Sequence, residues 1–484
     1  MILKDILKGE KYSVLGGSDS ADITSVEYDS RNVKKGSLFV CISGFKTDGH
    51  KYINQAVKSG AAALCVEKDI EIPEGVSCVK VENTRHALAA ASCNFYNRPA
   101  DKMRLIGVTG TNGKTTTTYL IKSILEKAGR KTGVIGTISN LIGDRAVHAE
   151  RTTPESLELN QLFCQMLDEG VEDVIMEVSS HSLDLNRVDC MNFAVGMFTN
   201  LTEDHLDYHK TMENYRDAKA KLFSISQNAV INIDDPYGDF MVKKAQGEII
   251  TTGINNSKAV LNAVNLVMRP SGVEFDFDYH KKTYHVVYGV PGKFSVYNAI
   301  GAIGAGILLG VPMDIIIEGI RCVKGVKGRF QVVDTVGGLT AIVDYSHTPD
   351  SLENMLKTAK EFVEGRIITV FGCGGDRDKM KRPIMGEIAG RLSDFCVITS
   401  DNPRSEDPDS IIDDIEPGTA KTGCDYVKIP DRREAIFYAI KMAGPNDFVA
   451  VAGKGHEDYQ IFADRTIHFD DAEVIAEAFK EKEK

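Results

Sequence analysis

Short apolar runs that read as strands alternate with helix-like stripes along most of the chain, and this alternation limits the fold more than any other feature. It is typical of α/β proteins, in which crossover helices cover parallel sheets. In the last third of the chain, strands are predicted at residues 341–344, 367–371, 396–399 and 448–452. Unusual polar residues follow these strands directly, and open α/β sheets bind ligands at the carboxyl ends of their strands. The pattern therefore predicts α/β architecture with a ligand site at those ends.

The length of 484 residues favours about three domains. We predict a mixed α/β domain over residues 1–98, a central domain with a P-loop-type parallel sheet over 99–329, and a Rossmann-like domain over 330–484. In the first domain, strands are expected at 38–41 and 63–66 and helices near 51–59 and 84–96. In the central domain, strands are expected at 104–109, 174–178, 194–199 and 230–232, with a helix after the first of them.

Charge and composition exclude several classes of protein. The net charge of −12 argues against nucleic acid or an anionic membrane as the main partner. The longest uncharged stretch, residues 294–313, contains four glycines, Asn298 and Pro312, so it predicts a buried helix and not a membrane span. The N-terminus lacks the basic-then-apolar pattern of a secretory leader, and the ten cysteines form no Cys-x-x-Cys pair. We expect a cytoplasmic monomer.

A glycine-rich turn joins the strand at 104–109 to the following helix. Its residues are Thr109, Gly110, Thr111, Asn112, Gly113, Lys114 and Thr115. Backbone N–H groups in such a turn cradle phosphates, the lysine pairs with the β- and γ-phosphates, and the threonine hydroxyl binds Mg²⁺. Val108 stands where the strict phosphate-loop spacing has glycine. The turn therefore predicts ATP and Mg²⁺ binding, with a purely structural turn as the alternative.

Four further residues show less decisive patterns. Glu177 ends an apolar strand, where a carboxylate either reaches a nucleotide-bound metal or forms a structural ion pair. His205 and His209 have i, i+4 spacing, which raises either a zinc site or one ligand to a nucleotide Mg²⁺; the glutamate of a metalloprotease helix is absent. The local sequence pattern around Lys219 predicts an ordinary, solvated lysine on a helix.

Taken together, these segments resemble the Mur ligase family over nearly the whole chain. The matching motifs are residues 109–116, 177–181, 199–209, 344–349, 374–379, 401–404 and 452–460. The resemblance is strongest to members that add the third residue of the peptidoglycan stem peptide. It implies that ATP phosphorylates the D-Glu side-chain carboxylate of UDP-MurNAc-L-Ala-D-Glu, and that an amino acid then attacks the acyl phosphate. Such catalysis depends mostly on positioning and charge neutralisation.

The resemblance also implies roles for individual residues. Lys114, Glu177, His205 and Lys219 are implied as catalytic, with Thr115, Glu177, His205 and Lys219 holding Mg²⁺. Lys219 matches the family's carbamylated lysine (N6-carboxylysine), which reverses its local interpretation. Asn298, Arg329 and Asp344 match nucleotide contacts. The implied contacts to the UDP-MurNAc dipeptide are Ser30, Phe45, Lys46, Thr47, Thr152, Thr153, Ser179 and Arg187.

The amino acid to be added is predicted from the loop Asp401, Asn402, Pro403 and Arg404. Meso-diaminopimelate differs from lysine by a second carboxylate, which a guanidinium binds bidentately. Arg404 therefore favours diaminopimelate, and an unpaired arginine would disfavour lysine. Arg382, Gly453 and Glu457 match further amino-acid contacts of the diaminopimelate-adding members. Without the resemblance, the same loop reads as an Asx-type turn with a surface arginine.

Two other functions remain open at this point. One is a different amide ligase of the same superfamily, such as a folylpolyglutamate synthetase or a neighbouring Mur enzyme. The other is a non-catalytic nucleotide-binding switch. The polar strand ends of the last third of the chain argue against a switch, because a switch needs no second substrate pocket.

Overall fold

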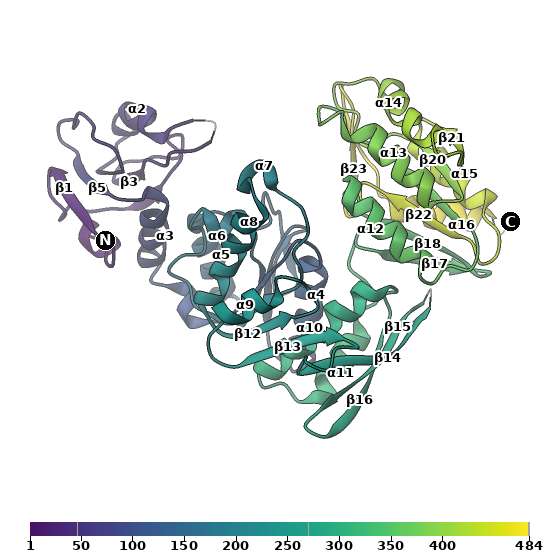
Figure 1. Ribbon diagram of the computed structural model, residues 1–484. Helices are drawn as coiled ribbons and strands as arrows, with labels where there is room; N and C mark the ends of the chain where they lie inside the picture. The colour runs from purple at the N-terminus through teal and green to yellow at the C-terminus, as the bar shows by residue number, and fades with distance from the viewer. Residues whose placement is uncertain (46, 270, 483–484) are drawn as a thin grey trace. The chain divides into compact units, whose positions relative to one another are not determined.

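The computed structural model describes residues 1–45, 47–269 and 271–482 (Figure 1). The chain divides into two compact units. The first consists of Met1–Leu261 with Ile300–Gly319, and the second of Asn262–Ala299 with Ile320–Lys484.

The first unit begins with a sheet of strand order β1-β5-β4-β3-β2. Its strands are β1 (Tyr12–Gly16), β2 (Ser25–Glu27), β3 (Ser37–Val40), β4 (Ala63–Val66) and β5 (Ser77–Val81). β1 runs antiparallel to β5, and the other pairs are parallel. The helices are α1 (Leu3–Ile6), η1 (Gly49–Tyr52), α2 (Ile53–Lys58) and α3 (Thr84–Phe95).

Successive side chains of β3 pack into two different hydrophobic cores, one on each face of the sheet. Leu38 and Val40 pack in the cluster that contains residues of α3, whereas Phe39 packs in the cluster that contains residues of α2. Successive residues of a strand point to opposite faces, so a continuous apolar run indicates a strand covered on both sides. The strands and helices predicted for this part of the chain are confirmed.

The central sheet of the first unit surrounds β6 (Arg104–Thr109), with strand order β13-β12-β11-β6-β10-β7-β8-β9. The other strands are β7 (Thr132–Ile135), β8 (Asn140–Ile142), β9 (Arg145–Val147), β10 (Asp173–Glu177), β11 (Phe193–Phe198), β12 (Ser226–Asn232) and β13 (Ile249–Ile254). From β13 to β7 all pairs are parallel, as predicted. β8 and β9 are antiparallel, so the expectation of a purely parallel sheet fails at this edge, where short hairpins replace crossover helices.

The helices of this region are η2 (Pro99–Lys102), α4 (Lys114–Lys127), α5 (Ser156–Asp168), α6 (Ser180–Asp184), α7 (Leu206–His209), α8 (Met212–Ser224) and α9 (Gly238–Lys244). The uncharged stretch predicted as a buried helix forms most of α10 (Lys293–Leu308), followed by α11 (Met313–Cys322). Val296, Ala299 and Ile303 on α10 are fully buried. Among the described residues, no helix is both long and apolar enough to cross a membrane.

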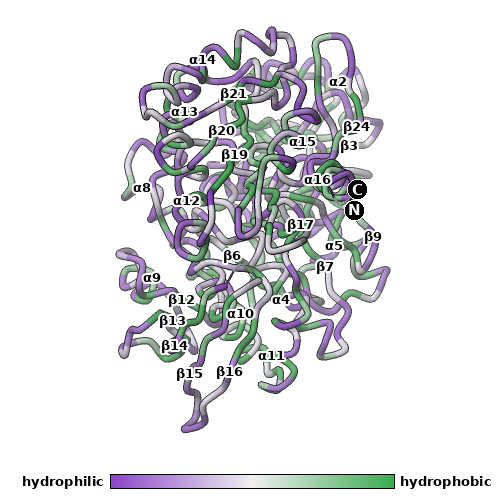
Figure 2. The backbone as a smooth tube through the Cα atoms, turned by 90° about the vertical axis from the view of Figure 1, so that its right-hand side faces the viewer, coloured by the Kyte–Doolittle hydropathy of each residue, from purple (hydrophilic) through white to green (hydrophobic). Residues whose placement is uncertain are grey.

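The second unit contains an antiparallel meander and a larger sheet. The meander consists of β14 (Leu261–Arg269), β15 (Gly272–Tyr279) and β16 (Lys282–Tyr288). Hydrophilic residues at the turn between β15 and β16 stand out in Figure 2. The larger sheet has the order β17-β18-β22-β19-β20-β21. It is parallel from β18 to β21, with β17 antiparallel at one edge.

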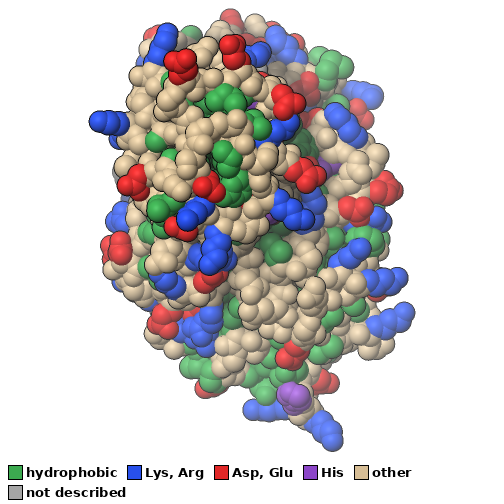
Figure 3. All heavy atoms as spheres, turned by 90° about the vertical axis from the view of Figure 1, so that its left-hand side faces the viewer, with side chains coloured by type: hydrophobic (Ala, Val, Ile, Leu, Met, Phe, Trp, Pro, Cys, Tyr) green, Lys and Arg blue, Asp and Glu red, His purple; other side chains and the backbone are tan. Residues whose placement is uncertain are grey.

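The strands of the larger sheet are β17 (Gln331–Val336), β18 (Leu339–Asp344), β19 (Ile367–Phe371), β20 (Phe395–Ile398), β21 (Asp425–Lys428) and β22 (Phe448–Ala452), and β23 (Tyr459–Ile461) pairs with β24 (Thr466–His468). The helices are α12 (Pro349–Lys360), α13 (Lys381–Leu392), α14 (Pro408–Ala420), α15 (Arg432–Met442) and α16 (Asp471–Lys482). Residues of α15 and α16 share a core cluster with one face of the sheet, and Figure 1 shows α12 and α13 on the other face. Figure 3 shows acidic and basic side chains interspersed over the molecular face that it displays.

Candidate functional site

The glycine-rich loop lies between the end of β6 and the start of α4, as predicted. Gly110 has φ +151° and Gly113 has φ +86°. A Cβ on Gly110 would stand 1.9 Å from Thr199 Oγ1, so only glycine fits there. The backbone N–H of Thr111 donates to Asn200 O (2.9 Å), and that of Asn112 donates to Asn200 Oδ1 (2.9 Å). The segment that follows β11 thus holds the glycine-rich loop in place.

Lys114 folds back over this loop. Its Nζ donates to Gly110 O (2.9 Å) and to Thr111 O (2.8 Å). The ammonium group therefore lies at the loop and the N-terminus of α4, where oriented N–H groups and the helix dipole favour an anion.

Thr115 and Glu177 meet below the loop. The Thr115 hydroxyl donates to Glu177 Oε1 (2.9 Å), and the backbone N–H and hydroxyl of Thr137 donate to Oε1 (3.0 Å) and Oε2 (3.1 Å). Glu177 is 1% exposed, and all three of these donors are uncharged. Sequence reasoning did not single out Thr137, because its contact with Glu177 joins two different strand ends.

This donor set suits a hard cation. Mg²⁺ takes oxygen ligands and keeps several waters, so a hydroxyl and one carboxylate are an adequate protein contribution. Within the part of the chain that the structure describes, no group of three or more His, Cys, Asp or Glu residues could hold a metal ion. The zinc alternative raised by His205 and His209 therefore has no support in these residues.

Lys219 is buried on α8, at 1% exposure, so its interpretation as a solvated helix lysine is wrong. Its Nζ donates to Gly110 O (2.8 Å) and lies 4.5 Å from the centre of the Tyr215 ring. Burial, and after it the charge of Lys114, hold the pKa of Lys219 well below its usual range. The local pattern could not predict this, because the side chain turns inward only where α8 packs against β6 and β12.

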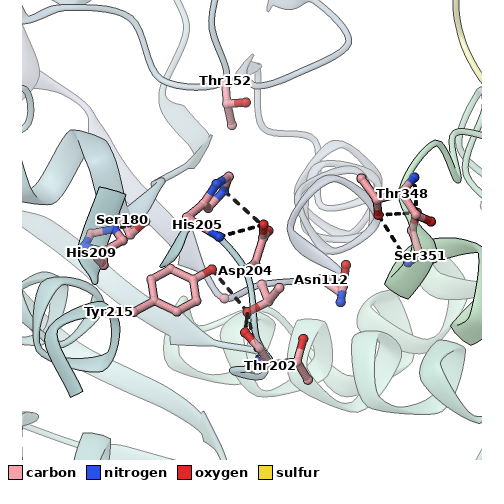
Figure 4. Close-up of polar contacts among 12 residues, drawn as sticks. Asn112, Thr152, Ser180, Thr202, Asp204, His205, His209, Tyr215, Thr348 and Ser351 are labelled. Atoms are coloured by element: carbon pink, nitrogen blue, oxygen red, sulfur yellow. Dashed lines mark hydrogen bonds and ion pairs between the residues drawn. The ribbon is translucent and has the colours of Figure 1, made fainter. Parts of the chain in front are cut away.

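Three histidines lie close together near Tyr215, and two of them, His205 and His209, are labelled beside it in Figure 4. His205 has φ +55° and immediately precedes α7; its Nε2 lies 3.4 Å from Asp204 Oδ2. His209 is buried, with Nε2 2.9 Å from Ser180 Oγ. The His181 ring lies 4.9 Å from that of His205. Burial lowers the pKa of all three, that of His181 to about 4, so the imidazoles are neutral near pH 7.

The residues predicted to contact the muramoyl peptide lie in three segments: Thr152 and Thr153 before α5, Ser179 just after β10, and Arg187 after α6. Thr153 Oγ1 donates to Glu177 O (2.8 Å), and the backbone N–H of Ser179 donates to Thr153 Oγ1 (3.1 Å). Arg187 Nη1 donates to Thr153 O (2.9 Å). Thr152 Oγ1 lies 3.0 Å from Thr137 Oγ1, so this group is continuous with the one around Glu177.

In the N-terminal sheet region, the predicted uridine contacts are less closely grouped. Ser30 is buried and its hydroxyl donates to Gln55 Oε1 (3.3 Å), whereas the Thr47 hydroxyl lies 3.1 Å from the Tyr52 hydroxyl. Phe45 is 75% exposed, and its ring centre lies 5.6 Å from that of Tyr208 in an edge-to-face arrangement. The prediction for Lys46 falls outside the described residues.

In the second unit, Asp344 ends β18 and accepts hydrogen bonds from the backbone N–H groups of Phe330 (2.7 Å) and Ser346 (2.9 Å). The Arg329 guanidinium lies 4.9 Å from the centre of the Tyr345 ring. Asn298 is buried on α10. Asp344 therefore fixes the backbone of two connecting segments, in addition to any contact with nucleotide.

The predicted amino-acid loop follows β20, and the segment after β22 packs against it. Asn402 Nδ2 donates to Glu457 Oε2 (2.8 Å), and a Cβ on Gly453 would stand 2.5 Å from Asp401 Oδ2. Arg404 has φ +53° and Nη1 donates to Gly375 O (2.8 Å). The backbone N–H of Asn402 donates to Asp401 Oδ1 (2.6 Å), its immediate neighbour. An Asx turn from Asp401 would need the N–H of residue 403, which is a proline, and the N–H of Arg404 donates to Ile461 O, so the predicted Asx-type bond is not formed. Pro403, between Asn402 and Arg404 in the sequence, is also buried.

Arg382 differs from the other predicted amino-acid contacts. Its side chain is fully buried on α13, and its Nη atoms bind Glu406 Oε1 (2.8 Å) and Asp414 Oδ2 (2.8 Å). The carboxylates of the protein itself thus neutralise this guanidinium. The role of Arg382 as a substrate contact stays a prediction.

Comparisons with known proteins place these features in a family context. Residues 22–96 match the family described as Mur ligase family, catalytic domain; residues 108–306 match Mur ligase middle domain; and residues 328–455 match Mur ligase, glutamate ligase domain. The chain is 50% identical to the UDP-N-acetylmuramoyl-L-alanyl-D-glutamate--2,6-diaminopimelate ligase of Clostridium botulinum, over 99% of this chain and 100% of the relative. It is 48% identical to the ligase of the same name from Clostridioides difficile, over 99% of both chains.

Solved structures give the same picture of the fold. A structure of a UDP-N-acetylmuramoyl-L-alanyl-D-glutamate--2,6-diaminopimelate ligase matches with a TM-score of 0.74 and 30% identity, covering 100% of this chain and 99% of the other. The MurF ligase from Thermotoga maritima in complex with ADP matches with a TM-score of 0.60, over 96% of this chain and 98% of that one. The second match, at 18% identity, concerns the fold alone.

Proposed function

Because this chain belongs to the Mur ligase family, we propose that it joins meso-2,6-diaminopimelate to the D-Glu side-chain carboxylate of UDP-MurNAc-L-Ala-D-Glu, using ATP and Mg²⁺, in peptidoglycan synthesis. The relatives with this activity in their names align with essentially the full chain. We also propose that the enzyme works as a cytoplasmic monomer, with domain boundaries near residues 98 and 329.

One observation carries the proposal at the level of chemistry: two lysine amines converge on a single backbone carbonyl of the phosphate loop. Lys114 Nζ and Lys219 Nζ lie 2.9 and 2.8 Å from Gly110 O. A structural turn needs no such pair, because burying a second amine beside the first costs free energy. A site that binds phosphate groups and a metal ion does need both lysine side chains.

Lys114 neutralises the phosphate that moves from ATP to the substrate carboxylate. A carboxylate is a poor electrophile, and phosphorylation gives it a leaving group without a protein nucleophile. The neutral amine of diaminopimelate then attacks the acyl carbon and the C–N bond of the amide forms. Phosphate leaves with the electron pair of the broken C–O bond, and the proton lost by the amine goes to the departing phosphate or to solvent. The protein contributes positioning and fixed positive charge, as in other phosphoryl transfers.

Lys219 is chemically suited to carbamylation. The neutral amine attacks CO₂, a C–N bond forms, and one proton is released, leaving a carbamate anion. Burial favours the neutral amine that this reaction requires, and nearby Lys114 favours the anionic product. With the carbamate, Glu177, Thr115 and His205 would hold Mg²⁺, which when bound supplies charge neutralisation at the phosphate oxygens.

Arg404 and Glu457 provide opposite charges for the two ends of the amino acid. Glu457 suits an ammonium group, and Arg404 suits the distal carboxylate that lysine lacks. Thr152, Thr153, Ser179 and Arg187 would contact the muramoyl dipeptide.

Phosphate release tests the proposal directly. Wild-type protein with ATP, Mg²⁺ and UDP-MurNAc-L-Ala-D-Glu should release phosphate when meso-diaminopimelate is added, and much more slowly with L-lysine at the same concentration. A preference for lysine would overturn the proposed specificity. No turnover with either amino acid would overturn the ligase itself.

A further inference from the structure

Lys454 is a fully buried lysine between two elements of the predicted amino-acid site. It follows β22, and its Nζ lies 3.2 Å from Asn402 Oδ1 and 3.2 Å from Glu457 Oε2. The Tyr459 ring centre lies 5.4 Å from the same Nζ. An ammonium without exposure is retained only where fixed acceptors replace its water.

The two acceptors of Lys454 also bind each other. Asn402 Nδ2 donates to Glu457 Oε2 (2.8 Å), which closes a triangle of ammonium, amide and carboxylate. Glu457 Oε2 therefore takes both bonds, and among the described residues no hydrogen bond to Oε1 is found. One oxygen of Glu457 is thus anchored, while the other is left for an incoming group.

The same triangle fixes the loop that carries Arg404. Asn402 Oδ1 accepts from the backbone N–H of Ile461 (2.9 Å), and the backbone N–H of Arg404 donates to Ile461 O (3.0 Å). Lys454 thereby connects the carboxylate of Glu457 to the backbone that holds the guanidinium of Arg404.

We propose that Lys454 is a positioning residue for the incoming amino acid: its buried ammonium fixes the carboxylate of Glu457 and the loop of Arg404 in one arrangement. This inference rests on the proposed function and deepens it. Lys454 touches neither ATP nor the reacting atoms in this assignment. Its loss should therefore act on the binding of the amino acid and leave the binding of ATP unchanged.

Lys454→Met tests this, because methionine keeps most of the volume and removes the charge. With ATP and UDP-MurNAc-L-Ala-D-Glu saturating, the KM for meso-diaminopimelate should rise at least about tenfold, which corresponds to roughly 1.4 kcal/mol. The KM for ATP should change less than about twofold. Lys428→Met is the matched control, since Lys428 is a surface lysine paired with Asp413 and Glu416 in the same unit. Both KM values of that variant should match wild type.

A double-mutant cycle with Glu457→Gln separates positioning from general destabilisation. If Lys454 acts through Glu457, the effect of Lys454→Met on the KM for diaminopimelate should shrink strongly in the Glu457→Gln background. Full additivity, or equal changes in both KM values, would overturn the proposal. If Lys454→Met does not fold, Lys454→Gln keeps a donor without the charge, and an unchanged KM for diaminopimelate in that variant would refute it. Absence of turnover in the wild type would instead refute the ligase function.

Discussion

Replacing Lys219 by methionine should separate stability from activity. The ammonium of Lys219 is buried, and burial together with Lys114 lowers its pKa. Between the lowered pKa of the folded state and the ordinary lysine pKa, the unfolded chain binds more protons at this site than the folded chain does. The free energy of unfolding therefore rises with pH across this window, and burial of the amine reduces stability at neutral pH. Each unit of lowering costs about 1.4 kcal/mol.

The structure allows the gain from Lys219→Met to be bounded. Gly110 O keeps a donor in the variant, because Lys114 Nζ lies 2.9 Å from it. No buried carbonyl is therefore orphaned, and replacing this buried, poorly compensated amine by an apolar side chain of similar volume should stabilise the fold on the scale of about 1–4 kcal/mol that apolar replacement of buried ionic groups gives. In buffer depleted of CO₂, the melting temperature of the variant should exceed that of the wild type by several degrees. In buffer that contains bicarbonate, the ligase activity of the variant should be at least about a hundredfold lower than that of the wild type. Lys221→Met is the control, since Lys221 lies on the same helix, half exposed and 2.8 Å from Asp184.

Bicarbonate gives a second, independent measurement on Lys219. Carbamylation consumes CO₂ only in the folded protein, so a tenfold excess over the dissociation constant should stabilise the wild type by about 1.4 kcal/mol. The Lys219→Met variant should show no such rise, and bicarbonate should not restore its activity. An equal melting shift in both proteins, or near-normal turnover of the variant, would refute the assignment of Lys219.

Three further substitutions have expected outcomes. Gly110→Ala should weaken ATP binding measured by titration calorimetry, because its Cβ would stand 1.9 Å from Thr199 Oγ1; unchanged affinity would mean that the loop relaxes freely. Arg432→Met should lower the free energy of unfolding by about 3–5 kcal/mol in urea titrations, since it leaves Asp471 buried without its bidentate partner; a loss below 1 kcal/mol would contradict this. Arg404→Ala should raise the KM for diaminopimelate far more than the KM for ATP in steady-state assays, and equal effects would exclude it from the amino-acid pocket.

Local sequence was sufficient where one element carries the whole signal. The glycine-rich turn, Glu177 at the end of a strand and the loop after β20 all lie where the strand–helix pattern placed them. The reason is that parallel strands present their carboxyl ends at one edge of a sheet, so order along the chain already predicts neighbourhood. The family resemblance rested on these same residues.

Tertiary structure decided the environment of each side chain. Lys219 looks solvated in its own helix and becomes buried only because α8 packs on the central sheet. The motif that contains Lys454 does not show from its sequence which of its residues are buried. The ammonium group of Lys454 binds Asn402, which lies 52 residues away in the sequence. Desolvation and ion pairing depend on groups that are distant in sequence, so periodicity can locate a lysine on an element but cannot determine its charge or its partners.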